Sequence, residues 1–279
     1  MRHERGAGWR VLTLLGVALA AGTLVSTARE SNGQTPHAET PMPAAGAVVA
    51  MARLAGGTFK MGDRGDTATV AAFSMDVTEV TVSAFAACVR AGSCAPDHLG
   101  QESADGKAFQ PAPACNYGRS GTGWGYRFTG SDPMNCLDAS QAATYCRAQG
   151  KRLPTEEEWE WAARGGGEGR LYPWGSAAPD AQLCWSGTAS RPGCAPAPTS
   201  CATTCAVGSH PSGDAPGGIH DLAGNVMEWT SSNLDASGAT RVARGGDASD
   251  YYEGNVHAAK RFGFSPVVRF TGIGFRCVR

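Results

Sequence analysis

The stretch KRLPTEEEWEWAARGG, residues 151–166, predicts the most regular element of the chain. Thr155 and Glu158 form a capping box, in which each side chain bonds to the backbone N–H of the other residue at the start of a helix. Trp159 shares one helical face with two alanines, so we expect it to be buried. The three adjacent glutamates fall at the positive end of the helix dipole. Capping therefore accounts for them without catalysis.

Two further helices and a strand are expected upstream of this stretch. Asp138 and Gln141 form a second capping box before an amphipathic segment. Alternating β-branched residues predict a strand from about Phe73 to Val82, and Ser83 is placed to cap the helix that follows. Glycine-rich and proline-rich loops separate these elements.

The composition describes a loop-rich globular domain and excludes one class of partner. The 24 Lys and Arg residues balance 25 Asp and Glu residues, which leaves a formal charge of -1. A nucleic-acid-binding domain usually carries a basic stripe, so we expect no nucleic-acid partner. Glycine, at 38 of 279 residues, is about twice as frequent as usual, while hydrophobic residues at 42% suffice for a core.

The N-terminal region is typical of an exported protein. In residues 1–28, arginines precede an apolar run at 11–25 and small residues follow it, as in a secretory signal peptide. An uncleaved membrane anchor is the alternative, although the run is shorter than the roughly 20 residues that span a bilayer. Residues 29–50 predict a flexible tether, and residues 51–279 the folded domain. We expect a periplasmic, cell-surface or secreted protein that is not integral to the membrane once the signal is removed.

All ten cysteines follow the predicted signal segment. In an oxidising compartment disulfides are the default interpretation. A structural zinc site is the alternative for the four cysteines that crowd into one Pro/Thr-rich stretch, namely Cys184, Cys194, Cys201 and Cys205. No C-x-x-C pair supports that alternative.

Five ordered motifs carry a family resemblance. They are KRLPTEEEWEWAARGG, YPWG, GIHDLAGNVMEW, RVARGGD and a terminal GFRC. The chain resembles the sulfatase-modifying-factor family, whose best-known member is the formylglycine-generating enzyme, from about Leu54 to Arg279. The resemblance implies an irregular α+β fold of the C-type-lectin-like kind, with little regular secondary structure.

The chemistry that this resemblance implies is not supported by the residues present. Formylglycine-generating enzymes use a cysteine pair shortly after an RGGS motif to bind Cu(I), because soft thiolates suit that ion. Here no cysteine lies between Cys205 and Cys277, Asp247 replaces the serine of the motif, and Met227 replaces a family tryptophan. We therefore expect no copper and no catalytic residues of the formylglycine-generating type.

The resemblance also implies a disulfide that joins Cys146 to Cys277, for which both cysteines are present. It further implies a structural calcium site, with oxygen ligands that suit this hard cation. The implied ligands are the side chains of Asp221 and Glu228 and the backbone carbonyls of Gly224 and Val226. The alternative is a turn in which the two carboxylates bind backbone amides or an arginine.

The loop Gly245–Asn255 lies where the copper site is missing. Its polar and aromatic side chains predict a pocket for a sugar, a peptide or a cation, formed by Asp247, Asp250, Tyr251, Tyr252, Glu253 and Asn255. The alternative is an exposed acidic loop, with Lys260, Arg261 and Arg269 neutralising its carboxylates.

Three functions follow from these expectations. The first is a non-catalytic, exported binding or scaffold module for a protein, peptide or glycan. The second is an enzyme, either an oxidoreductase of the formylglycine-generating type or one with altered chemistry at the Gly245–Asn255 loop. The third is a structural partner in an envelope complex. No nucleophile elbow, zinc-protease motif or phosphate-binding loop occurs in the sequence.

Overall fold

The computed structural model describes residues 49–97, 99, 101–102, 109–110, 115–117, 121–123, 126–187 and 203–279. The predicted signal peptide and nearly all of the predicted tether lie outside the described residues, as do two of the four crowded cysteines, Cys194 and Cys201.

The described helices are short. They are α1 (Val82–Arg90), α2 (Ala139–Ala148), α3 (Glu156–Ala163) and the 3-10 turns η1 (Gly166–Glu168), η2 (Pro211–Gly213) and η3 (Glu253–Val256). The strands are equally short and form several small sheets. They are β1 (Met51–Leu54), β2 (Gly57–Met61), β3 (Asp66–Val70), β4 (Phe73–Asp76), β5 (Gln101–Glu102), β6 (Phe109–Gln110), β7 (Gly121–Gly123), β8 (Tyr126–Phe128), β9 (Met227–Asn233), β10 (Arg241–Arg244), β11 (Arg261–Phe264) and β12 (Ile273–Gly274).

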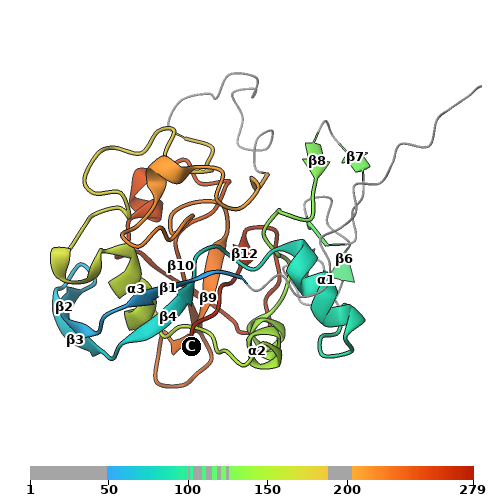
Figure 1. The fold of residues 1–279 in the computed structure, drawn as a ribbon, viewed down its shortest axis with the longest axis horizontal. Helices are drawn as coiled ribbons and strands as arrows, with labels where there is room; N and C mark the ends of the chain where they lie inside the picture. The colour runs from blue at the N-terminus through green and yellow to red at the C-terminus, as the bar shows by residue number, and fades with distance from the viewer. Residues whose placement is uncertain are drawn as a thin grey trace, which may run out of the picture. The chain divides into compact units, whose positions relative to one another are not determined.

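One four-stranded sheet, in the order β11-β10-β9-β12, lies at the centre of the fold. Its strands pair antiparallel except β12, which runs parallel to β9. β1 pairs with β4, and β2 forms a hairpin with β3. Helix α3 contacts both this hairpin and the central sheet (Figure 1). This arrangement brings the middle of α3 close to the beginning of β9 and the end of β10.

The predicted capping boxes are confirmed at both helices. In α3 the Thr155 hydroxyl accepts from the Glu158 backbone N–H, and the Glu158 carboxylate accepts from Thr155. The same exchange joins Asp138 and Gln141 at α2. Trp159 is fully buried, as its helical face predicted. The glutamates of α3 do more than cap, however, because Glu156 also binds the Arg261 guanidinium through both oxygens.

The expected strand from Phe73 to Val82 was wrong in its second half, since β4 ends at Asp76. Beyond it the backbone pairs with several different segments: the Val80 N–H donates to the Phe275 carbonyl, and the Val80 carbonyl accepts from Met134. The β-branched pattern thus reflects burial between segments. The cap of α1 was also misplaced, because Thr81 accepts from the Ala84 N–H while Ser83 donates its own N–H to Gly130.

The described cysteines form four disulfides. They are Cys88–Cys94, Cys115–Cys136, Cys146–Cys277 and Cys184–Cys205. The third confirms the pairing that the resemblance implied. The fourth contradicts a four-thiolate zinc site, because two of its ligands are used in a covalent bond. Disulfides of this number indicate folding in an oxidising compartment.

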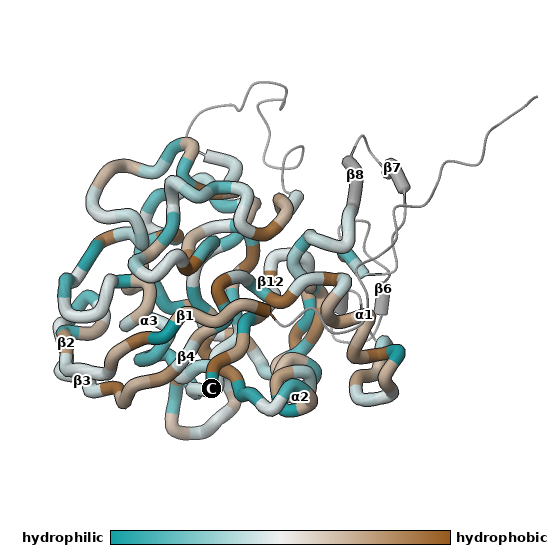
Figure 2. The backbone as a smooth tube through the Cα atoms, viewed as in Figure 1, coloured by the Kyte–Doolittle hydropathy of each residue, from teal (hydrophilic) through white to brown (hydrophobic). Residues whose placement is uncertain are grey.

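Apolar segments along the described chain are short and alternate with polar ones (Figure 2). Within the described residues, no helix has the length and apolarity that crossing a bilayer requires.

Candidate functional site

A buried ion pair lies where the turn Asp221–Glu228 enters β9. The Arg276 Nε donates to both Glu228 oxygens at 2.9 and 2.8 Å, and Nη2 donates to Oε1 at 2.8 Å. Trp159 Nε1 donates to Glu228 Oε2 at 2.8 Å. All three side chains are almost completely buried. The family-like motifs of α3, β9 and the C-terminal segment therefore meet in one hydrogen-bonded cluster.

A second buried carboxylate, Glu79, lies beside this cluster. Its Oε1 accepts from Asn225 Nδ2 at 2.9 Å, but the buried Oε2 has no hydrogen-bond partner. Burial raises the Glu79 pKa well above its ordinary value, and the charges of Asp221 and Glu228 raise it further while Arg276 opposes them. Three carboxyl groups thus lie around one guanidinium, and the raised pKa favours the neutral form of Glu79 unless a further cation is bound.

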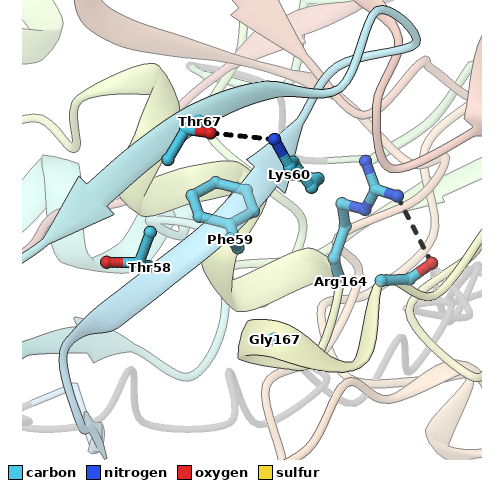
Figure 3. A pocket seen from close by; sticks show the side chains of 7 residues that line it. Thr58, Phe59, Lys60, Thr67, Arg164 and Gly167 are labelled. Carbon is cyan, nitrogen blue, oxygen red and sulfur yellow. Dashed lines mark hydrogen bonds between the residues drawn. The ribbon is translucent and has the colours of Figure 1, made fainter.

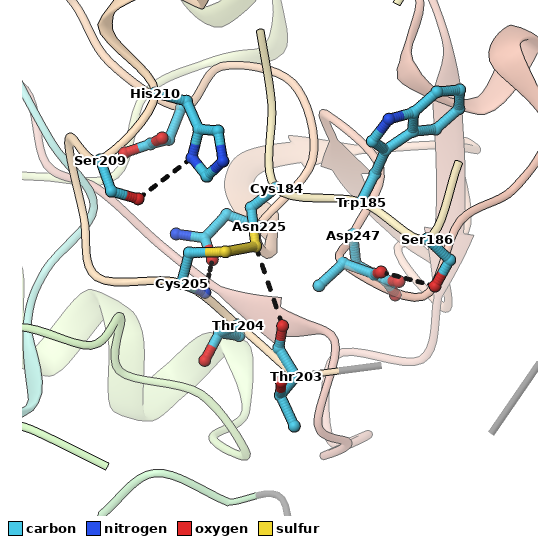
Figure 4. Close-up of a disulfide and its surroundings, with 12 residues drawn as sticks. Cys184, Trp185, Ser186, Thr203, Thr204, Cys205, Ser209, His210, Asn225 and Asp247 are labelled. Atoms are coloured by element: carbon cyan, nitrogen blue, oxygen red, sulfur yellow. Dashed lines mark hydrogen bonds between the residues drawn. A yellow bond between two sulfur atoms is a disulfide. The ribbon is translucent and has the colours of Figure 1, made fainter. Parts of the chain in front are cut away.

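Asp221 and Asn225 shape the turn between these groups. Both have positive φ, 57° and 58°, which short polar side chains tolerate better than most. Asp221 Oδ2 accepts from the Gly208 N–H at 2.6 Å, and Asn225 Oδ1 accepts from the Cys205 N–H at 2.9 Å. The Cys184–Cys205 disulfide and Asn225 lie together in Figure 4.

The Gly245–Asn255 loop is fixed to this turn through its backbone. The Gly245 carbonyl accepts from Gly224, and the Ala248 N–H donates to the Asn225 carbonyl. On its other side, Ser186 donates to the carbonyls of Ala248 and Asp250, both at 3.0 Å (Figure 4). The loop is therefore held on two sides by residues outside it.

Asp247 lies inside this loop with only 6% of its surface exposed. Its Oδ1 accepts from the Ser249 N–H at 2.7 Å and from the Ser249 hydroxyl at 2.5 Å. Burial raises the pKa of Asp247 to about 6; the hydrogen bonds from Ser249 oppose this effect and the charge of Asp250 adds to it. This loop therefore contains a carboxyl group that titrates near neutral pH.

Replacing Asp247 with asparagine is expected to stabilise the protein at pH 7.5 and to have little effect at pH 4. The folded pKa of about 6 exceeds the unfolded value of 3.8, so ionisation destabilises the fold as the pH rises through this window. Each pKa unit corresponds to about 1.4 kcal/mol, so we expect a gain of about 1–3 kcal/mol. Urea unfolding at both pH values measures it. The exposed Asp63, changed to asparagine, is the control, and an equal gain at both pH values contradicts the prediction.

Asp250 and Asn255 bind each other across the loop. Asn255 Nδ2 donates to Asp250 Oδ1 at 2.6 Å, and Asp250 Oδ2 accepts from the Asp247 N–H at 2.9 Å. Both side chains are thereby committed to the structure of the loop. Tyr251 and Tyr252, in contrast, are each 66% exposed. Of the six residues expected to form a pocket, the two tyrosines lie on the surface and Asp247 lies inside.

Two of the three cations expected to neutralise the loop are used elsewhere, so that expectation was wrong for them. Arg261 binds Glu156 on α3, and Arg269 binds Asp138 at the start of α2. Lys260 lies over the ring of Phe262, at 5.4 Å from its centroid. The local sequence places these cations near the loop, but β11 and the segment after it direct the two arginines toward α3 and α2.

Comparisons with known proteins identify the family. The family model of the sulfatase-modifying factor enzyme 1-like domain matches residues 37–279 of this chain. The chain belongs to the sulfatase-modifying-factor family. The formylglycine-generating enzyme of Streptomyces coelicolor is 32% identical over 279 residues, covering 81% of this chain and 87% of that enzyme. The inactive C-alpha-formylglycine-generating enzyme 2 of Bos taurus is 36% identical over 186 residues, covering 61% of this chain and 56% of the relative. This chain thus spans little more than half of that relative's length.

Two solved structures share the fold of this chain. PvdO from Pseudomonas aeruginosa has a TM-score of 0.59 at 22% identity, covering 82% of this chain and 93% of PvdO. CarF has a TM-score of 0.57 at 20% identity, covering 83% and 98%. The chain therefore has the irregular α+β fold that the resemblance implied.

The residues of the loop do not fit the copper site of the sulfatase-modifying-factor family. Every described cysteine forms a disulfide, and the segment between Cys205 and Cys277 contains none. A carboxylate and an amide, Asp250 and Asn255, bind each other in the stretch after the RGG motif. These are hard donors, whereas Cu(I) requires soft sulfur ligands.

The calcium site implied for the sulfatase-modifying-factor family has partial support from the geometry. The unpartnered oxygen of Glu79, and the three carboxyl groups around a single guanidinium, fit a divalent cation. Glu228, however, is held by Arg276 and Trp159, as in the alternative interpretation of the turn. Among the residues that the structure describes, no three His, Cys, Asp or Glu side chains form a metal-binding group.

Sequence reasoning missed two members of the buried cluster. Glu79 lies in an alternating segment, where a polar residue usually faces solvent, and Arg276 was noticed only as part of the GFRC motif. The available signal was a charged residue between two apolar neighbours at Arg276, and a charged residue in a β-branched run at Glu79. Figure 1 shows that the segment after β4 and the C-terminal segment cross the same central region.

Proposed function

We propose that this chain is a non-catalytic, exported binding module of the sulfatase-modifying-factor family, whose ligand is a protein, peptide or glycan. The observation that carries the proposal is the Asp250–Asn255 hydrogen bond, which stands in the stretch where the family's copper-binding cysteines are expected. The buried cluster beneath the loop is intact, so the fold is maintained without the thiolates.

The exposed tyrosines supply the binding surface in this proposal. Tyr251 and Tyr252 lie on a loop whose backbone is anchored on both sides. Rigid, amphipathic tyrosine side chains give large contact areas at a low cost in conformational entropy, and tyrosine is enriched at binding hot spots. Because the loop backbone is already ordered in the free protein, ligand binding costs little further conformational entropy of the backbone.

A gain-of-function experiment tests the non-catalytic part. The reduced loop variant Asp250→Cys/Asn255→Cys places two thiols where the present side chains touch, so we expect it to bind Cu(I). The native chain is expected to bind none at this loop and to form no aldehyde on a cysteine-containing peptide with Cu(I) and oxygen. Mass spectrometry of the peptide measures the aldehyde. Turnover by the native chain above a copper-only blank overturns the proposal.

The binding part is tested with a glycan array and a displayed peptide library. We expect saturable binding that falls at least about tenfold in Tyr251→Ser/Tyr252→Ser, as for hot-spot residues. Val267→Ser, which removes another exposed apolar side chain, is the matched control. Equal binding by native protein and the tyrosine variant contradicts the proposed surface.

An enzyme with altered chemistry is the second candidate, because Asp247 has the pKa of a general base near neutral pH. The hercynine oxygenase of Mycolicibacterium smegmatis, 39% identical over 108 residues, shows that enzymes named for another reaction share part of this sequence. That match covers 38% of this chain and 23% of the relative. Proton transfer by Asp247 would require its side chain to become accessible to a substrate.

We further propose structural calcium at the turn, with the side chains of Asp221 and Glu228 and the carbonyls of Gly224 and Val226 as ligands. Calcium is expected to raise the melting temperature, because a cation that binds only the folded state stabilises it by about 2.7 kcal/mol at 100 times its Kd. Glu79→Gln is expected to weaken the response, because it removes a carboxyl group that a bound cation would hold in its charged form beside the turn. The melting temperatures of the native chain and the variant are measured in EGTA, in calcium and, for comparison, in magnesium. Identical melting in all three solutions contradicts the proposal.

A further inference from the structure

A cavity of about 290 Å³ lies on another part of the fold, between the β2–β3 hairpin and the turn that follows α3 (Figure 3). None of its lining residues belongs to the Gly245–Asn255 loop or to the buried cluster. Its lining combines hydroxyls, two cations, an aromatic ring and bare backbone, from Thr58, Phe59, Lys60, Thr67, Arg164, Gly167 and Gly169.

Lys60 carries a charge that no described carboxylate neutralises. In the hairpin register Lys60 lies opposite Thr67, and its ammonium donates to the Thr67 hydroxyl at 2.9 Å. This hydroxyl fixes the position of the ammonium but contributes no negative charge. Of the ion pairs between described residues, none includes Lys60.

Arg164 supplies the second cation, and its hydrogen bonds are incomplete. Nη1 donates to Glu160 at 3.0 Å and Nη2 to the Gly169 carbonyl at 3.3 Å, while the buried Nε has no partner. The Glu160 carboxylate is shared, because Arg244 binds its other oxygen and the Gly62 N–H donates to the first at 2.6 Å. One negative charge is therefore divided between two guanidinium groups.

The carboxylates of α3 and of the turn after it do not cancel this charge. Glu168, in η1, is already paired with Arg170 at 2.7 Å. Glu156 is bound by Arg261 and also lies 4.0 Å from the Arg244 Nε. Taken together, Glu156 and Glu160 face Arg164, Arg244 and Arg261, to which Lys60 adds a fourth cation.

The glycine turn leaves one wall of the cavity without side chains. Gly165, Gly166 and Gly169 have φ near +70°, which favours glycine. A Cβ added at Gly167 would meet nothing within 4 Å, so this side is open to an incoming group. The opposite wall is rigid, since Phe59 packs edge-on against Trp161 with ring centroids 5.3 Å apart.

We infer that this cavity binds a tetrahedral oxyanion, either as free phosphate or sulfate or as the phosphate or sulfate ester group of a small molecule. A guanidinium and an ammonium are the side chains that proteins use for such groups, through charge-assisted hydrogen bonds. The threonine hydroxyls add neutral donors on the hairpin side. The volume admits the anion and a small attached group.

Titration of the full chain with inorganic phosphate, sulfate and acetate, at constant ionic strength, tests the inference. Calorimetry is expected to show saturable binding of phosphate or sulfate and much weaker binding of acetate. Lys60→Gln is expected to weaken binding at least about tenfold, the effect of one lost charge-assisted hydrogen bond, while Lys60→Arg retains it. Arg53→Gln, which removes an exposed cation from β1, is the matched control and is expected to bind like the native chain.

Glucose 6-phosphate and glucose 6-sulfate then distinguish the two sources of the anion, with glucose as the neutral blank. Binding of either ester supports the inference and names its group. No saturable binding of any oxyanion, equal binding of acetate, or an equal loss in Arg53→Gln overturns it. Because the lining residues are separate from the tyrosine loop, failure here leaves the proposed ligand surface intact.

Discussion

Replacing Arg276 with methionine is expected to destabilise the protein by about 3–5 kcal/mol. The methionine fills part of the volume but leaves the Glu228 carboxylate buried without its cation, and removing one partner of a buried pair costs this much. The guanidinium also interacts with Glu79 and Asp221, and these interactions are lost as well. Its donated hydrogen bonds to the carbonyls of Asp76 and His220 disappear as well.

Urea unfolding at pH 7.5 measures this effect, with Arg152→Met as the matched control. Arg152 also binds a glutamate, Glu158, through two hydrogen bonds of 2.6 Å, but its side chain is 51% exposed. Exposed pairs contribute about 0–1 kcal/mol. A similar loss of stability in the two variants would contradict the prediction that burial makes the Arg276–Glu228 pair more costly to break.

Removal of the Cys146–Cys277 disulfide, with alanine at both positions, is expected to cost about 5 kcal/mol. The bridge closes a loop of 131 residues, and the loop-entropy model relates the stabilisation to the logarithm of that length. The same model gives about 2 kcal/mol for Cys88–Cys94, which closes only 6 residues. The two double-alanine variants are therefore a matched pair.

Both variants are to be unfolded under conditions that prevent disulfide exchange. Mass spectrometry verifies that the remaining disulfides are intact. The predicted order of stability is native, then the Cys88–Cys94 variant, then the Cys146–Cys277 variant. The reverse order would show that local packing around each sulfur pair outweighs the constraint on the unfolded chain.

The parts of this fold that sequence predicted are those decided by neighbouring residues. Thr155 and Glu158 are three residues apart, so their exchange of hydrogen bonds follows from helix geometry alone. The predicted cap of α1 was wrong because Ser83 is positioned by its hydrogen bond to Gly130, which is distant in sequence. β4 ended early for the same reason, since the segments that pair with residues 77–80 come from four other parts of the chain.

The candidate site shows the same division. The family motifs located the turn Asp221–Glu228 and showed that the cysteine pair is missing, because both features depend only on residue identities. The partners of the charged residues were not visible. Arg261 and Arg269 are close in sequence to the acidic loop, yet they bind Glu156 and Asp138 more than one hundred residues away. The Lys60–Arg164 cavity joins two segments that no local pattern relates.

The way the C-terminal segment crosses the core has a consequence for biosynthesis. Phe275, Cys277 and Val278 are fully buried, and their backbones bind residues near 74–80 and Arg152. The two main apolar clusters each include residues from this segment. A nascent chain that has not yet reached residue 278 therefore lacks part of both clusters and keeps apolar surface exposed. We therefore expect folding to be completed late, after nearly the whole domain has been synthesised.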